Sequence, residues 1–434
     1  MARATPAGEE GTRALKHTRR ILPTWRAIVS FLVAALAVAL AYLLGRAEYL
    51  VVAGLAVLLP VAGLLFVRLR RPRLDVVRLF SPPVVAVGGL AQVTVRVTNL
   101  GVTPSTSLAW DDALPWYEPL STRELPTLRP GARHTLTSTY DLHPPRRGLY
   151  AIGPFVAEYD DPFGMATSTV AIGSPDRLVV VPAVSSLSEG GPTLADGDGQ
   201  AHLVQRRSTG NDDDLTTREY RRGDALRRVH WRASARHGQL MVRQEEPRSH
   251  PDARLLVDTR RGGYPDARVD TGFSWGADWA SERFEWVVRM TASLGLHLEA
   301  AGFRVAIDET AHPQIEPLGD VGDRHRAEGF LTSLAGVQLL DSTLSGMRAF
   351  GTAEGAGPLF AILGDPEPVV VDALIARRRP GEAGFAFLVG AAAATGERLR
   401  DAGWTVIDAD PRDDPGAAWR AAATVTTGAV RGAR

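Results

Sequence analysis

Two long apolar runs near the N-terminus constrain this chain more than any other feature of its sequence. Residues 27–45 (AIVSFLVAALAVALAYLLG) and 49–67 (YLVVAGLAVLLPVAGLLFV) carry no charge, and three residues separate them. Each run has the length that an α-helix needs to cross a bilayer. A cleaved signal peptide is the alternative, but the second run follows too closely and no convincing cleavage site intervenes. The sequence therefore predicts a transmembrane hairpin, with Pro60 kinking its second helix without ending it.

Basic residues flank this hairpin unevenly. The connecting turn has only Arg46, offset by Glu48, whereas the outer flanks carry Arg3, Arg13, Lys16, Arg19, Arg20, Arg26, Arg68, Arg70, Arg71 and Arg73. The positive-inside rule places such flanks in the cytoplasm. We therefore expect a multi-pass protein of the cell membrane, with a cytoplasmic tail at 1–26, two helices in the bilayer at 27–67 and cytoplasmic soluble domains.

The composition narrows the class of the soluble part. A chain of 434 residues is long enough for two or three domains. Lys plus Arg and Asp plus Glu both number 49, so no global field attracts nucleic acid. The chain has no cysteine, which excludes disulfides, thiolate metal sites and a cysteine nucleophile.

The periodicity of apolar residues changes twice after the hairpin. In residues 74–183, short segments of alternating apolar and polar residues, such as AQVTVRVTNLG, are separated by Pro and Gly residues. This pattern predicts an immunoglobulin-like antiparallel β-sandwich. Residues 184–214 are rich in Gly, Ser and Asp and are interpreted as a flexible loop or linker. After residue 250, short apolar strands such as ARLLVDT alternate with amphipathic helices, which predicts a mostly parallel sheet covered by helices. Residues 215–434 are thus expected to form one α/β domain that begins with an arginine-rich segment.

Asp258 ends the first strand of that α/β pattern, at the edge where open α/β sheets bind ligands. Domains of the von Willebrand factor A type hold a divalent cation there through the spacing Asp-x-Ser-x-Ser. Arg260 and Gly262 replace both serines here, and a guanidinium beside the pocket opposes cation binding. Asp258 is therefore a weak metal candidate and is expected to be a structural aspartate.

Motifs for catalysis are otherwise missing from the sequence. We find no phosphate-binding glycine loop, no paired metal-binding histidines and no glycine-flanked serine nucleophile. The sequence assigns no catalytic residue and no cofactor, and it favours a protein without enzymatic activity.

The stretch REYRRGDALRRVHWRASARHG, residues 218–238, concentrates seven arginines and a tryptophan. Asp224 is placed to cap a helix from Ala225 to about Arg236, ended by His237 and Gly238. On that helix a buried stripe is expected at Leu226, Val229, His230 and Ala233. Arg228, Arg232 and Arg236 line another face, and Trp231 falls on the polar side.

This face has two interpretations: a solvated helix, or a partner surface of the residue types that anchor interfaces. Nucleic acid is disfavoured because the net charge is zero and the chain has a membrane anchor.

The same stretch resembles the signature of domain of unknown function 58. The match to that pattern consists of Arg218, Glu219, Tyr220, Gly223, Asp224, Arg227, Trp231, Ala235 and Arg236, and RRGLYAIGP and DPFG resemble the family's upstream β region. The resemblance implies a membrane hairpin, a β-sandwich and a von Willebrand A-like domain. It also implies partners encoded nearby, namely a MoxR-type AAA+ ATPase and a transglutaminase-like membrane protein. It supplies no reaction and no catalytic residue.

The sequence is therefore interpreted as a membrane-anchored scaffold or adaptor for a MoxR-type AAA+ ATPase, in a chaperone-like or envelope-related assembly. The expected partner-binding residues are Arg218, Glu219, Tyr220, Asp224, Arg227, Arg228, Trp231, Arg232 and Arg236. A hydrolase with an unrecognised pocket in the α/β domain and a metal-dependent binding module are the alternatives.

Overall fold

The computed structural model describes residues 20–116, 123–131, 134–188, 217–220, 229, 231–243, 251–269, 279–318, 324–341, 357–379 and 381–432. The chain divides into two compact units, and each is described by itself. The first contains residues 1–183, 267–281 and 331–339. The second contains residues 184–266, 282–330 and 340–434.

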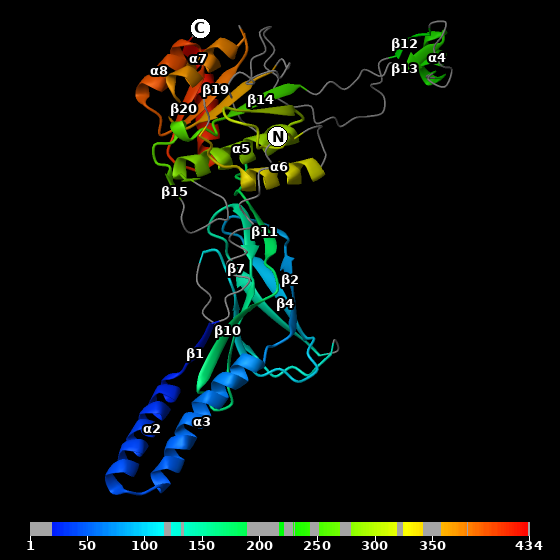
Figure 1. Ribbon diagram of the computed structural model, residues 1–434. Helices are drawn as coiled ribbons and strands as arrows, with labels where there is room; N and C mark the ends of the chain where they lie inside the picture. Colours follow the sequence, from blue (N-terminus) through cyan, green and yellow to red (C-terminus); the bar gives the residue numbers. More distant parts are fainter. Residues whose placement is uncertain are drawn as a thin grey trace, which may run out of the picture. The chain divides into compact units, whose positions relative to one another are not determined.

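The two apolar runs form the antiparallel helices α2 (Trp25–Leu44) and α3 (Glu48–Leu69), drawn in blue in Figure 1. Gly45 ends α2 with a positive φ of 63°, a conformation that costs glycine little. The helices pack through small residues, because those buried within them include Ala34 and Ala37 on α2 and Ala53 and Ala56 on α3. The helix α3 continues through Pro60.

Both helices are long and apolar enough to span a membrane, with mean hydropathies of 2.6 and 2.8 over their most apolar windows. A core helix of a soluble protein passes the same test, but it is mostly buried. Here only 17% of the window in α2 and 28% of that in α3 is buried. Such exposure of apolar side chains favours a lipid environment over a water-facing surface.

Residues 74–181, called the β region below, form strands within three sheets. The strands are β2 (Leu74–Ser81), β3 (Val84–Ala86), β4 (Ala91–Asn99), β5 (Leu108–Asp112), β6 (Arg123–Leu125), β7 (Thr135–Leu142), β8 (Gly148–Ile152), β9 (Phe155–Asp160), β10 (Ala166–Ile172) and β11 (Asp176–Val181). With the additional strand β1 (Arg20–Pro23), their orders are β1-β10-β9-β5-β6, β2-β4-β7 and β3-β11-β8. All neighbours are antiparallel except β3 and β11.

Strand β1 (Arg20–Pro23) pairs with β10 and immediately precedes α2. The sequence assigned these residues to a tail, and the structure places them at the edge of a sheet. Four residues that end in proline suit an edge strand, since proline has no N–H to donate to a second neighbour.

The alternating pattern of β4 explains how the β region builds its core. Ala91, Val93, Val95 and Val97 are buried, and the residues between them face outward. Trp110 stacks on Phe155 with ring centroids 4.7 Å apart, joining β5 to β9 within the same core. A period of two thus places one face of each strand inside.

A charged cluster lies within the β region. The guanidinium of Arg78 donates to Oδ1 of Asp112 at 2.6 and 3.0 Å, and both side chains are fully buried. Tyr140 donates its hydroxyl to Oδ2 of Asp112 at 2.6 Å, and Arg78 also reaches Asp176 at 3.1 Å. We call Arg78, Asp112, Tyr140 and Asp176 the buried ion cluster. Its polar groups satisfy one another, which is the condition for tolerating charge in a core.

The second unit contains a five-stranded, fully parallel sheet of order β17-β14-β18-β19-β20. Its strands are β14 (Asp252–Val257), β17 (Arg304–Glu309), β18 (Leu359–Leu363), β19 (Gly384–Val389) and β20 (Thr405–Ala409). Numbered along the chain, the order is 2-1-3-4-5, one of the two common doubly wound arrangements. The order reverses between β14 and β18, and ligands of such folds bind at the carboxyl ends of the strands there.

Helices cover both faces of this sheet. The covering helices are α5 (Glu282–Ala300), α7 (Pro368–Arg377), α8 (Ala393–Asp401) and α9 (Pro415–Gly432), and a further helix, α6 (Arg324–Gly336), begins in this unit. Val370 of α7 and Leu399 of α8 join one core cluster with Leu256 and Ala361, while Trp419 of α9 contacts Phe360 on the opposite side. Burial on both faces explains why β18 and β19 read as continuous apolar runs.

Candidate functional site

The described parts of the arginine-rich segment form a small group of elements, here called the signature module (residues 217–220, 229 and 231–243). Strand β12 (Thr217–Glu219) pairs antiparallel with β13 (Met241–Arg243), and helix α4 (Trp231–His237) lies between them in the chain. Figure 1 shows these three elements grouped together. Val229, Met241 and Val242 are buried, so the module has a minimal apolar core.

Helix α4 is shorter than the sequence predicted. It begins at Trp231, because Val229 forms a β-bridge with Val242 and is therefore extended. A β-branched residue favours such extended pairing over a helix. The end was predicted correctly: Gly238 adopts a φ of 72° and donates its N–H to the carbonyl of Ser234 at 2.9 Å. The hydroxyl of Ser234 accepts from the N–H of Met241 at 2.9 Å, which joins α4 to β13.

The outer side of α4 presents a tryptophan and two arginines. Trp231 is 68% exposed, although a tryptophan of a folded domain usually buries most of its ring. Arg232 and Arg236 are exposed on the same helix. This confirms the expectation that Trp231 lies on the polar side, and the exposed ring stands on the same short helix as the two exposed arginines.

The other predicted partner-binding residues fall at the edge of this surface or beyond the described residues. Arg218 and Glu219 lie in β12, and Glu219 accepts from Gln239 at 2.5 Å. Tyr220 is half-buried and follows β12, with its N–H donated to Leu240 at 2.8 Å. Outside the described residues lie Gly223, Asp224, Leu226, Arg227, Arg228 and His230.

Asp258 lies where the strand order of the parallel sheet reverses. It follows β14 directly and is 1% exposed. Oδ1 accepts the hydroxyl of Thr310 at 2.5 Å, whereas Oδ2 is buried and has no hydrogen-bond partner within the described part of the chain. Burial raises the pKa of Asp258 to about 6, because removing water disfavours the carboxylate.

The chain itself fills the space beside Asp258. Arg260 is buried and forms an ion pair with Glu367, which follows the neighbouring strand β18. The short 3₁₀ turn Arg261–Gly263 packs so closely that a Cβ at Gly263 would overlap Oδ2 of Asp258. The hydroxyl of Tyr264 donates to the carbonyl of Asp258 at 2.6 Å. A guanidinium and a tight turn therefore occupy the position at which doubly wound sheets generally bind ligands.

Sequence reasoning identified Asp258 and Arg260 but missed their partners Thr310 and Glu367. Each follows a parallel strand that neighbours β14, so the strand order is the signal that brings them together. Among the described residues, no group of three or more His, Cys, Asp or Glu side chains could hold a metal ion.

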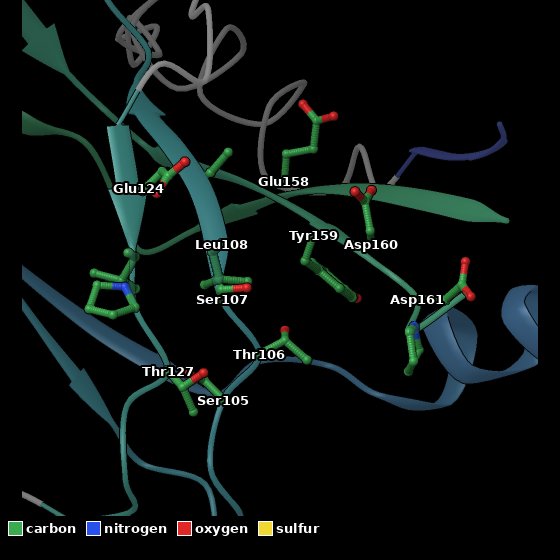
Figure 2. A pocket seen from close by; sticks show the side chains of 14 residues that line it. Ser105, Thr106, Ser107, Leu108, Glu124, Thr127, Glu158, Tyr159, Asp160 and Asp161 are labelled. Atoms are coloured by element: carbon green, nitrogen blue, oxygen red, sulfur yellow. The ribbon is translucent and has the colours of Figure 1, made fainter. Parts of the chain in front are cut away.

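A pocket of about 850 Å³ opens at one end of β5, β6 and β9 in the β region (Figure 2). Its described lining combines hydroxyls with carboxylates, from Ser105, Thr106, Ser107, Thr127, Glu124, Glu158, Asp160 and Asp161. Figure 2 shows Glu158 and Asp160 on the same side of β9, as the period of a strand requires. Asp160 accepts from Thr167 at 2.7 Å, and the carboxylate of Asp161 accepts two backbone N–H groups of its own turn. Two of the four carboxylates thus have structural roles.

Comparisons with known proteins agree with the signature. No curated protein matches the chain. One similar solved structure is the CARDB domain of the PF1109 protein from Pyrococcus furiosus, in complex with di-metal ions. It is 24% identical over 24% of this chain and 89% of that chain, with a TM-score of 0.17, too low to support a shared fold or ligand. Residues 216–314 match the family model described as "Protein of unknown function DUF58", and this match includes the signature module, β14, α5 and β17. The similarity to the DUF58 family is thus shown for this segment of the chain.

Proposed function

We propose that this protein is a membrane-anchored adaptor that recruits a partner protein through its signature module. The observation that carries the proposal is the exposure of Trp231, 68%, beside the exposed cations Arg232 and Arg236. Tryptophan and arginine are the side chains most enriched among binding hot spots. A solvated helix without a partner gains nothing from a large apolar ring in water.

The α/β unit supports an adaptor over an enzyme or a metal-dependent module. The crevice beside Asp258 is the usual ligand position of a doubly wound sheet, and Arg260 and Gly263 fill it. A divalent cation there would have to displace the ion pair between Arg260 and Glu367. We therefore propose that this unit has a von Willebrand A-like fold but does not bind partners through a metal ion. The β region is proposed to be an immunoglobulin-like sandwich.

The proposed partner is a MoxR-type AAA+ ATPase. This chain resembles the DUF58 family in its signature, and genes of that family commonly lie beside genes of such ATPases. A transglutaminase-like membrane protein is the second component of the same assembly. The hairpin is proposed to span the cell membrane with both termini in the cytoplasm, because basic residues gather on its outer flanks. A cytoplasmic signature module would then meet a cytoplasmic ATPase.

Co-purification from membranes tests the adaptor proposal. The full chain, co-expressed with the MoxR-type ATPase of the same genome, should retain the ATPase after mild detergent extraction, and Trp231→Ala should lose it. The matched control is Arg398→Gln with Arg400→Gln, two half-exposed arginines of α8 that pair with Asp372 and Asp408. Equal recovery with the wild-type chain and Trp231→Ala would show that this surface does not bind the ATPase.

A reporter fused to the C-terminus tests the orientation separately. An enzyme that is active only outside the cytoplasm should give no signal there and a strong signal in the turn near Arg46. The opposite pattern would move both soluble units outside and exclude a cytoplasmic ATPase as the partner.

A further inference from the structure

A rigid turn of the β region is fixed to the start of α2. In this turn, Asp161 accepts the N–H of Phe163 at 2.8 Å through Oδ1, and its carbonyl accepts from Gly164 at 3.0 Å. Thr24, the residue before α2, donates its hydroxyl to the carbonyl of Gly164 at 2.6 Å and its N–H to Met165 at 2.9 Å. The turn nevertheless leaves Phe163 51% exposed.

A second rigid turn is fixed to the chain just after α3. Asn99 is buried, accepts from Gly101 at 2.8 Å, and donates to the carbonyls of Thr103 and Leu128 at 2.9 and 3.0 Å. The next residue, Leu100, donates its N–H to the carbonyl of Arg73 at 2.8 Å, four residues beyond the end of α3. Leu100 is 63% exposed and Val102 is 92% exposed.

The hairpin itself sets the level of these turns relative to the apolar runs. The carboxylate of Asp161 lies 2.9 Å from where a Cβ of Gly63 would be, so the first turn packs beside α3. Gly63 lies four residues before the end of the apolar run at Val67, which is about 6 Å along the helix axis. The hydroxyl of Tyr159 also donates to the carbonyl of Arg70 at 2.8 Å. The first turn therefore lies at the level where a spanning hairpin leaves the hydrocarbon layer, and the second turn is fixed to Arg73, six residues beyond the end of the apolar run.

The charge of this end fits an anionic surface. Residues 20–26, 68–75, 99–103 and 160–165 contain six arginines and three aspartates, one of which, Asp161, is buried. The guanidinium of Arg26 lies 5.9 Å from the ring centroid of Trp25, and that of Arg70 lies 5.4 Å from that of Phe66. Trp25 is 68% exposed. Aromatic rings and arginines together are the side chains that membrane proteins place among lipid headgroups.

We propose that Phe163, Leu100 and Val102 insert into the headgroup layer of an anionic phospholipid membrane, while Arg26, Arg70, Arg71 and Arg73 contact lipid phosphates. The β region then rests on the membrane through two turns in addition to the hairpin, and its orientation to the bilayer is fixed. This inference rests on the membrane anchoring in the proposed function, because a hairpin outside a bilayer would bring no lipid to these turns.

Single-cysteine labelling tests this directly, because the chain has no cysteine of its own. Leu100→Cys and Phe163→Cys, each carrying an environment-sensitive fluorophore, are reconstituted as full chains into phosphatidylcholine vesicles with phosphatidylglycerol. The matched control is Leu90→Cys: Leu90 is 50% exposed and precedes β4, whereas Leu100 follows it. The nine residues of β4 place the two positions about 30 Å apart.

We expect a spin label on the lipid headgroups to quench the fluorophores at positions 100 and 163 about twofold or more beyond that at position 90. Equal quenching at all three positions would overturn the inference, and cross-linking of the labelled turns between copies would replace the lipid by a second copy of the chain. Replacing phosphatidylglycerol by phosphatidylcholine should reduce the difference. An unchanged difference would overturn the contact of the arginines with anionic lipid.

Flotation of the same vesicles separates this inference from the anchoring on which it rests. A chain that floats with vesicles after alkaline extraction, without preferential quenching at positions 100 and 163, is anchored but has no lipid contact at the turns. A chain that does not float with the vesicles would contradict the proposed membrane anchoring instead. Val102→Cys provides a second position in the Leu100 turn if Leu100→Cys folds poorly.

Discussion

The β region and the signature module use arginine in opposite ways. In the β region, Arg78 is buried and makes hydrogen bonds to Asp112, Asp176 and a backbone carbonyl, so the guanidinium is part of the core. In the signature module, Arg232 and Arg236 stand exposed beside an exposed tryptophan. Removing a buried, paired charge should reduce stability strongly, whereas removing an exposed one should affect binding and leave the fold intact.

The parallel sheet has a third arrangement at the point where its strand order reverses, namely a buried charged group that is only partly hydrogen-bonded. Asp258 is as buried as Asp112, but one of its oxygens has no partner among the described residues, and its pKa is raised to about 6. Among those residues, every buried side-chain nitrogen or oxygen without a partner lies outside the β region. The buried charges of the β region therefore have all their hydrogen-bond partners, whereas the buried carboxylate of Asp258 in the α/β unit lacks one within the described part of the chain.

The largest effect is expected for Asp112→Ala. This change leaves the guanidinium of Arg78 and the hydroxyl of Tyr140 buried without their main acceptor, so unfolding should become about 3–5 kcal/mol easier. Asp176→Ala is the matched control, because Asp176 also pairs with Arg78 but its side chain is 42% exposed. That change should cost about 0–1 kcal/mol in the same denaturant titration of the full chain. Equal costs would show that burial does not set the strength of this cluster.

Asp258→Asn should have a smaller effect that depends on pH. The folded-state pKa of about 6 lies above the value near 3.9 of an unfolded aspartate, so the folded protein binds more protons between these values. Wild-type stability should therefore fall as the pH rises from 4 to about 6, by on the order of 2–3 kcal/mol. Because asparagine does not ionise, the stability of the variant relative to the wild type should increase from pH 4 to about 6. Melting temperatures of both chains at each pH measure this difference. A constant difference from pH 4 to 8 would contradict a raised pKa.

Trp231→Ala should cost less still, within about 1 kcal/mol, because the ring is largely exposed. Met241→Ala removes a buried side chain of the same module and should cost about 2 kcal/mol or more. Protease resistance of the module in the full chain compares the two. If Trp231→Ala is digested as fast as Met241→Ala, the tryptophan supports the fold and is not a free surface.

The smallest effect on stability is expected for Arg232→Gln combined with Arg236→Gln. Exposed charges contribute about 0–1 kcal/mol each, so the melting temperature should hardly change. The same double variant should weaken partner binding most at low salt, where charge attraction is least screened. A salt dependence identical to that of the wild type would exclude these arginines from the interface.

Local patterns predicted much of the fold. The uncharged runs locate α2 and α3 to within two residues at each end, and strict alternation locates β4. The order of strands and helices after residue 250 predicts the parallel sheet, because each strand there is a short apolar run between helical segments. These signals are strong since burial on one or two faces sets their period.

Non-local contacts account for what the sequence could not predict. Asp111 and Asp112 resemble turn residues, yet they end β5 inside the core because Arg123 and Arg78 pair with them. Val229 was expected in a helix, but its pairing with Val242 on a later strand makes it extended. Arg260 was expected to oppose a cation, while its actual partner, Glu367, lies more than one hundred residues away. In each case a tertiary partner overrides the local pattern.

The most direct test of the adaptor proposal is the affinity of the full chain, held in nanodiscs, for the purified MoxR-type ATPase. We expect Trp231→Ala to weaken binding by about 30-fold or more, the loss of one hot spot of roughly 2 kcal/mol, while the melting temperature stays near that of the wild type. Arg398→Gln with Arg400→Gln should bind as the wild type does. An affinity unchanged by Trp231→Ala, in a chain that folds and inserts normally, would contradict the claim that this exposed surface recruits the partner.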